Sequence, residues 1–129
     1  MTTGILSFRV LFWKAFIRLV AYDVRFGRNF ARLHRAVREW TVSTVKAPAG
    51  TIERVCEAVN HACVWYPKHV LCLQRSFATA CLLRQCGIPA QLVMGAQQLP
   101  FKAHAWVEVD GCAVNEENNV TLYSVWERC

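Results

Sequence analysis

Glycine and proline are scarce in this chain of 129 residues, which contains six and four of them. Their scarcity excludes collagen-like and low-complexity proteins, and the scattered glycines form no phosphate-binding loop. Charged residues are also few, at 19%, against 54% hydrophobic residues. That balance excludes a disordered chain and indicates a small folded domain with a single hydrophobic core.

Long apolar runs and paired cysteine motifs are absent as well. Arg9, Lys14 and Arg18 interrupt the apolar N-terminal segment, so neither a secretory signal peptide nor a transmembrane helix of roughly 20 apolar residues fits there. The seven cysteines include no C-x-x-C pair and no zinc-finger spacing. We therefore expect a reduced, cytoplasmic protein without metal or cofactor, in which most cysteines are small core side chains.

Charge is distributed unevenly along the chain. Residues 1–50 contain nine Lys or Arg and two Asp or Glu, whereas residues 51–129 contain six and seven. The asymmetry predicts a helical N-terminal region over 1–50 that serves for docking or packing, and a nearly neutral core domain over 51–129. The segment 46–50, which contains Pro48, is the expected linker between them.

The first predicted helix, residues 5–26, has a narrow polar face. Its polar stripe is about 40° wide at helical spacing, and the stripe consists of Ser7, Lys14, Arg18 and Arg25. Such a helix must bury most of its circumference in its own core, in a partner protein or, less favourably, in a membrane surface. The narrow stripe and the large aromatic side chains beside it argue against nucleic acid as a partner.

The remaining periodicity predicts an α+β fold, with helices first and a small antiparallel sheet after them. Helices are expected over residues 28–45, from Thr51 to Pro67 and over 72–86, the last closed by Gly87 and Pro89. Strands are expected over residues 91–96, 103–109, 112–117 and 121–126, with a hairpin turn at Asp110-Gly111.

Cys72 is the candidate nucleophile because of its position. It begins the helix that Gly87 closes, where unpaired N–H groups and the helix dipole lower a thiol pKa and favour the thiolate. Pro67 breaks the chain just upstream, which supports a helix start at this point. Cys81 lies two and a half turns into the same helix and has no such advantage.

His104 is the candidate base, and the predicted hairpin supplies it with an acid. If Asp110-Gly111 forms a two-residue turn, Glu117 lies opposite His104, with Cβ atoms about 4.5–5.5 Å apart. A three-residue loop would place Glu116 there instead. A carboxylate beside the imidazole fixes its tautomer and stabilises the imidazolium, which is the third role in a Cys-His-acid triad. The alternative interpretation of residues 115–118 is a solvated acidic loop.

These residues belong to a set of motifs that resembles the leader peptidases of lasso peptide biosynthesis. The resemblance spans about residues 52–118 and includes Cys72–Ser76, Leu82–Arg84, Gly87–Ala90, Pro100–Phe101 and Ala103–Val109. It implies a transglutaminase-like, papain-like fold in which the sheet packs on the nucleophile helix, with Cys72 as nucleophile and His104 as base. The acid is usually aspartate in this family, whereas this chain offers Glu116 or Glu117.

The resemblance also implies a function. Such enzymes are cysteine proteases that cut the leader from a ribosomal precursor peptide, after which a cyclase similar to asparagine synthetase joins the exposed amine to a side-chain carboxylate. Residues 1–50 do not look like the leader-recognition domain of the longer family members. The chain therefore resembles the split form, which works with a separate recognition protein, and Arg75 and Lys68 are candidates for contacting the precursor. The alternative function is a non-catalytic transglutaminase-like binding module in a peptide-maturation complex.

Overall fold

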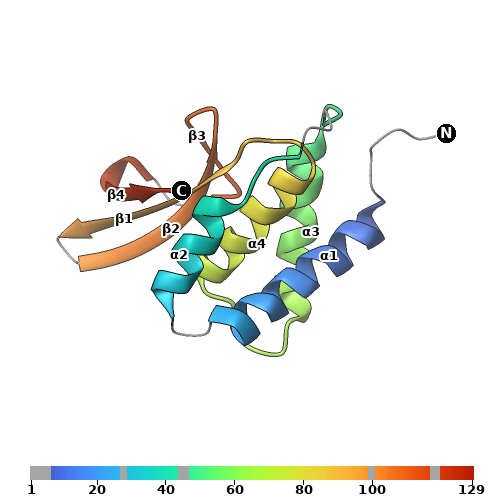
Figure 1. Ribbon diagram of the computed structural model, residues 1–129, viewed down its shortest axis with the longest axis horizontal. Helices are drawn as coiled ribbons and strands as arrows, with labels where there is room; N and C mark the ends of the chain where they lie inside the picture. The colour runs from blue at the N-terminus through green and yellow to red at the C-terminus, as the bar shows by residue number, and fades with distance from the viewer. Residues whose placement is uncertain (1–6, 27–28, 44–46, 99–100, 117–119) are drawn as a thin grey trace.

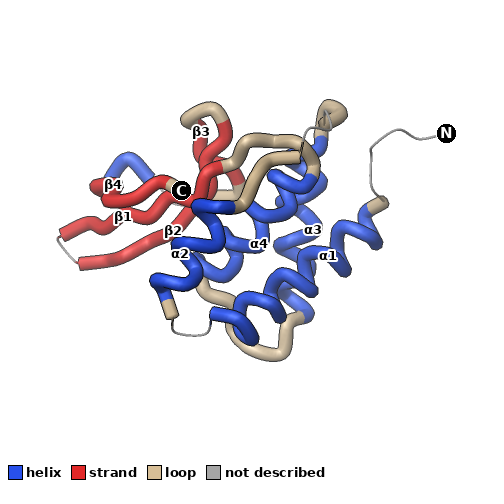
Figure 2. The backbone as a smooth tube through the Cα atoms, in the orientation of Figure 1, coloured by secondary structure: helices blue, strands red, loops and turns tan. Residues whose placement is uncertain are grey.

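The computed structural model describes residues 7–26, 29–43, 47–98, 101–116 and 120–129. Figure 1 and Figure 2 show helices on one side of a twisted antiparallel sheet, which confirms the expected α+β fold. The helical segments are α1 (Phe8–Ala21), the π-helical turn η1 (Tyr22–Phe26), α2 (Phe30–Glu39), α3 (Thr51–Trp65), α4 (Cys72–Gln85) and the 3-10 turn η2 (Val120–Leu122). The strands are β1 (Gln91–Gln98), β2 (Phe101–Val109), β3 (Cys112–Val114) and β4 (Ser124–Arg128).

Helix α4 is the central element of the fold. It contacts β1 and β2 on one side and α1 and α3 on the other, and most of its residues are buried. A helix enclosed in this way shows little amphipathic character, since nearly every face meets another element. Arg84, near its end, is buried and donates hydrogen bonds to the carbonyl oxygens of Val37, Trp40, Ala90 and Cys129. Through Arg84, α4 is therefore joined to α2, to the segment between α4 and β1, and to the C-terminus.

Helix α1 buries one apolar face in the core of the protein and leaves a second apolar face exposed. Ser7 caps α1 by accepting a hydrogen bond from the Val10 N–H, at 3.3 Å. Leu11, Ala15 and Leu19 are buried in a core cluster shared with α3 and α4. The opposite face remains apolar and open, and we call it the exposed α1 face; its residues are Val10, Trp13, Ile17, Val20 and, in η1, Val24.

The sheet has the order β3-β2-β1-β4, with every pairing antiparallel. Several elements differ in length from the expectation. The second helix ends at Glu39 rather than near residue 45, and Trp40 adopts an extended conformation. Strand β1 continues to Gln98, and the last strand runs over Ser124–Arg128 after a 3-10 turn. Strand β4 pairs with β1 and so completes the sheet on the side opposite β3.

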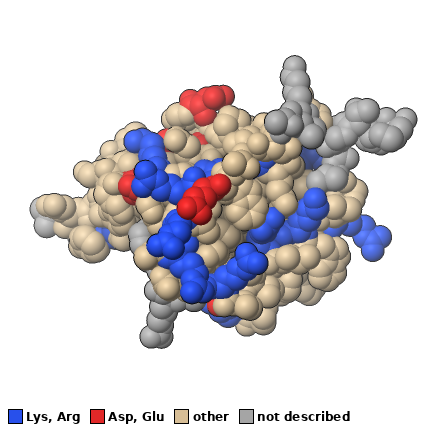
Figure 3. Space-filling model, in the orientation of Figure 1, with Lys and Arg blue, Asp and Glu red and all other residues tan. Residues whose placement is uncertain are grey.

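None of the described basic side chains in residues 7–43 is buried. Figure 3 shows Lys and Arg side chains gathered over α2 and along α1. Arg18 from the polar stripe of α1 stacks on the Trp40 ring, 4.4 Å from the ring centroid. In the part of the chain that the structure describes, no helix is both long enough and apolar enough to cross a bilayer.

Candidate active site

Cys72 is the first residue of α4, as the sequence predicts. Leu71 precedes it in an extended conformation and makes no side-chain capping hydrogen bond, so no side chain at that position covers the N–H groups of the first turn. The Cys72 side chain is half-buried against a core cluster that includes Phe77 and Ala105. The candidate nucleophile therefore lies where a helix start meets strand β2.

Burial makes five of the other thiols harder to ionise. It raises the pKa of the Cys81 thiol to about 12 and that of Cys56 to about 11. Burial also raises the pKa values of Cys63, Cys86 and Cys129. These five thiols are held in the protonated form, which is the poor nucleophile. Cys112 is exposed at the start of β3, away from a helix terminus.

His104 lies on β2 and forms a close pair with Glu116. The distance between His104 Nε2 and Glu116 Oε2 is 2.6 Å, and the two side chains are 9% and 2% exposed. The His104 ring also stacks on Trp106 and lies against Tyr123, with centroids 5.8 Å and 5.4 Å away. A buried carboxylate and two aromatic rings fix the imidazole and leave Nδ1 as the ring nitrogen that does not face the acid.

The hairpin geometry explains which glutamate meets His104. Val109 pairs with Cys112, and the intervening Asp110 and Gly111 have φ values of 52° and 79°, so the turn has two residues as predicted. That register was expected to bring Glu117 opposite His104. Instead the ladder with β2 ends at the Val107–Val114 pair, and Asn115 follows with a φ of 55°.

The left-handed residue redirects the chain, so that Glu116 reaches His104 one residue earlier than an uninterrupted ladder would allow. Asn115 is fixed by its neighbours, since its Oδ1 accepts a hydrogen bond from Asn60 and its Nδ2 donates one to Thr79 Oγ1. Glu117 lies outside the described residues. The sequence pattern ties the choice between the two glutamates to loop length, whereas the structure brings Glu116 to His104 from a two-residue turn through the conformation of Asn115.

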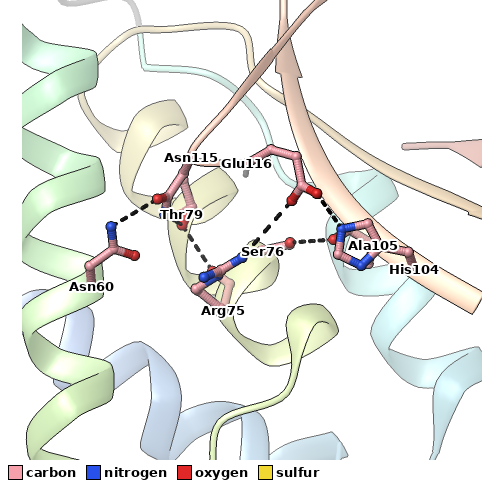
Figure 4. A network of polar contacts seen from close by, with 8 residues as sticks. All are labelled: Asn60, Arg75, Ser76, Thr79, His104, Ala105, Asn115 and Glu116. Atoms are coloured by element: carbon pink, nitrogen blue, oxygen red, sulfur yellow. Dashed lines mark hydrogen bonds and ion pairs between the residues drawn. The ribbon is translucent and has the colours of Figure 1, made fainter. Parts of the chain in front are cut away.

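A polar network joins this pair to the first turns of α4, as Figure 4 shows. Arg75 Nη2 lies 3.9 Å from Glu116 Oε1, and Ser76 Oγ donates a hydrogen bond of 3.1 Å to the Ala105 carbonyl oxygen. Ser76 is one turn after Cys72 on the same helix. The start of α4 is therefore held beside the His104–Ala105 segment of β2, which β3 does not pair with.

A polar cavity of about 550 Å³ opens next to this network. Arg75 and Asn115 connect it to the His104–Glu116 pair. Its lining carries basic and amide groups and is formed by Asn60, Cys63, Val64, Tyr66, Lys68, His69, Val70, Arg75 and Asn115. Both residues proposed to contact a precursor, Arg75 and Lys68, therefore lie in its wall.

The remaining histidines and acids have other surroundings. His34 Nε2 lies 2.5 Å from Glu127 Oε2, which joins α2 to β4. His61 packs edge-on against the Phe8 ring. Glu108, which lies too far along β2 to reach His104 directly, accepts a hydrogen bond from Trp106 Nε1 and pairs with Arg128.

One acidic residue that the sequence pattern did not single out contacts the segment before α4. Asp23, in η1, forms an ion pair with Lys68 at 2.8 Å, between Nζ and Oδ1. The only signal in the sequence was that Asp23 is one of two acidic residues among the first 50. Among the described residues, no three or more His, Cys, Asp or Glu side chains are grouped so that they could hold a metal ion.

A sheet that packs on a helix beginning with cysteine, and that carries a histidine paired with a buried acid, suits a transglutaminase-like protein. The sequence matches the transglutaminase-like superfamily over residues 17–127, and the chain therefore belongs to this superfamily. The match includes α4, β2 and the acid that follows β3. The expected fold family is thereby confirmed.

Part of the chain is also similar to a peptide-processing protein. Over 49 residues the chain is 41% identical to the microcin J25-processing protein McjB of Escherichia coli. The matched segment covers 38% of this chain and 24% of McjB, so the chain spans about a quarter of that relative's length. No solved structure matches the chain significantly. Both matches are consistent with the family resemblance described from the motifs.

Proposed function

We propose that this protein is a cysteine peptidase that removes the leader from a ribosomal lasso peptide precursor before the macrolactam is closed. The observation that carries the proposal is the His104–Glu116 pair, at 2.6 Å, beside the first turns of the helix that Cys72 begins. The similarity to a microcin-processing protein supports a role in peptide maturation.

The mechanism assigns one role to each group. His104 Nδ1 takes the proton from the Cys72 thiol, and the thiolate attacks the carbonyl carbon of the last leader residue. Backbone N–H groups of the first turn of α4 bind the oxyanion that forms. The imidazolium then protonates the departing amine of the core peptide, which leaves an acyl-enzyme. Water, deprotonated by His104, hydrolyses the thioester and returns the free thiol.

Glu116 holds His104 in the productive tautomer and stabilises its charged form. Its carboxylate contacts Nε2 and is 2% exposed, so bulk water screens the interaction little. A carboxylate in this place orients a base without taking part in bond making. We therefore assign the third role of the triad to Glu116, although aspartate is usual in the family.

The partners of this enzyme are also part of the proposal. A separate recognition protein would hold the leader and raise its effective concentration at Cys72, and a cyclase similar to asparagine synthetase would use the released amine. The exposed α1 face supports docking, because Trp13 and Ile17 are 58% and 61% exposed while the other side of the helix is buried. Apolar patches of this kind mark interaction surfaces.

Substitution of the nucleophile tests the proposed reaction. Cys72→Ala should abolish cleavage of the precursor by the protein together with the recognition protein, with an unchanged circular dichroism spectrum. The matched control is Cys81→Ala on the same helix, which removes a buried thiol and should leave cleavage intact apart from some loss of stability. Cleavage that persists in Cys72→Ala would refute the proposed nucleophile. Absence of cleavage by the wild-type protein together with the recognition protein would favour a non-catalytic binding module.

A further inference from the structure

The end of the first helix carries a polar cluster that the proposed mechanism does not use. The helix changes from α to π geometry at Tyr22, and η1 places the Asp23 carboxylate against the loop that leads to Cys72. π-helical turns within α-helices are often found at functional sites. Tyr22, next to Asp23, packs against the same core cluster as Cys72.

Three side chains converge on Asp23. Tyr66 Oη donates a hydrogen bond of 2.5 Å to Oδ2, Gln74 Nε2 donates one of 3.1 Å to Oδ2, and Lys68 Nζ lies 2.8 Å from Oδ1. Gln74 Nε2 also donates to the Leu19 carbonyl oxygen, at 2.9 Å, and the Gln74 side chain is buried. Both acceptors, the carboxylate and the carbonyl, belong to the end of the first helix.

The electrostatics agree with this geometry. Desolvation by itself would raise the pKa of Asp23, but hydrogen bonds from Lys68, Tyr66 and Gln74 outweigh it and hold the pKa below its usual value. Burial and the bond to Asp23 raise the pKa of Tyr66 to about 12. Asp23 is thus an ionised acceptor and Tyr66 a protonated donor throughout the neutral range.

The cluster brackets the candidate nucleophile along the chain. Tyr66 and Lys68 precede Cys72 by six and four residues, and Gln74 follows it by two. One carboxylate therefore anchors the approach to α4 and its first turn at the same time. A displacement of about 1 Å at a reacting group can cost about a hundredfold in rate, so an anchor at this point bears directly on the chemistry.

We propose that Asp23 is a positioning residue that fixes the 66–71 loop and the first turn of α4, so that residues 19–23 of the N-terminal region complete the active site. The inference rests on the proposed function, because it concerns the placement of Cys72. The N-terminal region would then contribute a residue to the active site in addition to its proposed docking surface. The family match, which begins at residue 17, includes Asp23.

Asp23→Asn tests the inference, because it keeps the shape of the side chain and removes its charge. Hydrogen exchange of the full-length protein should become faster in the 66–74 segment. The value of kcat for leader cleavage should fall about tenfold while KM changes less than about twofold, since positioning affects the chemical step more than substrate binding. Asp23→Glu, which restores the charge, should recover part of kcat.

The control is Glu57→Gln, which removes an exposed carboxylate from α3 and should change neither measurement. Unchanged exchange at 66–74 in Asp23→Asn, or faster exchange with an unchanged kcat, would overturn the inference. If Asp23→Asn does not fold, Tyr66→Phe removes a single hydroxyl from the same cluster and is judged by the same two results. Cleavage by Cys72→Ala would refute the proposed function separately, and the exchange measurement would still report on the anchor.

Discussion

Replacement of Glu116 by glutamine gives the sharpest test of the site. The substitution keeps the size of the side chain and removes the charge that faces His104 Nε2 at 2.6 Å. A hydrogen bond to a charged group contributes about 1.5–3 kcal/mol, and the low exposure of both side chains places this one near the upper end of that range. Since about 1.4 kcal/mol corresponds to tenfold in rate, kcat should fall roughly 100-fold.

The assay is single-turnover cleavage of the precursor in the presence of the recognition protein, with thermal unfolding as a check on the fold. Glu117→Gln is the matched control, because it removes the adjacent carboxylate from the same acidic segment. We expect Glu116→Gln to have the larger effect. A fall in kcat for Glu117→Gln as large as or larger than that for Glu116→Gln would refute the assignment of the acid. A wild-type kcat in both variants would indicate a Cys-His dyad that works without either carboxylate.

Two further predictions concern the docking face and the buried thiols. Trp13→Ala and Ile17→Ala should weaken co-purification with the recognition protein without lowering the melting temperature, whereas Leu19→Ala, at a fully buried position, should cost about 2–5 kcal/mol of stability. Point substitutions are a cleaner test than deletion of residues 1–26, because the deletion also removes buried core residues and Asp23. Wild-type binding of the recognition protein by Trp13→Ala and Ile17→Ala would contradict the docking role. Cys81 and Cys56, with pKa values raised to about 12 and about 11, should resist iodoacetamide at pH 8 in the folded protein and react on unfolding, as mass spectrometry can show. Because their pKa values are raised on folding from the ordinary value of 9.0, the stability they contribute should decline as the pH rises from about 9 towards 12; a melting temperature that increases over this interval would contradict that sign.

Local sequence patterns determined most of the elements and the positions of two candidate site residues. Pro67 and Gly87 bound the helix that begins at Cys72, and Asp110-Gly111 favours a two-residue turn because its residues tolerate positive φ values. Those signals depend on neighbours along the chain, so they can be recognised without knowledge of the fold. The strand that carries His104 and the family motifs around it were recognisable in the same way.

Only the tertiary structure shows which described glutamate meets His104, which face of α1 is buried and which residues contact Asp23. The choice of Glu116 depends on the left-handed backbone of Asn115, which contacts Asn60 and Thr79 on other elements. The burial of one apolar face of α1 and the exposure of the other depend on where α3 and α4 pack, because both faces are apolar. Asp23 meets partners at least 43 residues away in sequence, and such contacts leave no local pattern.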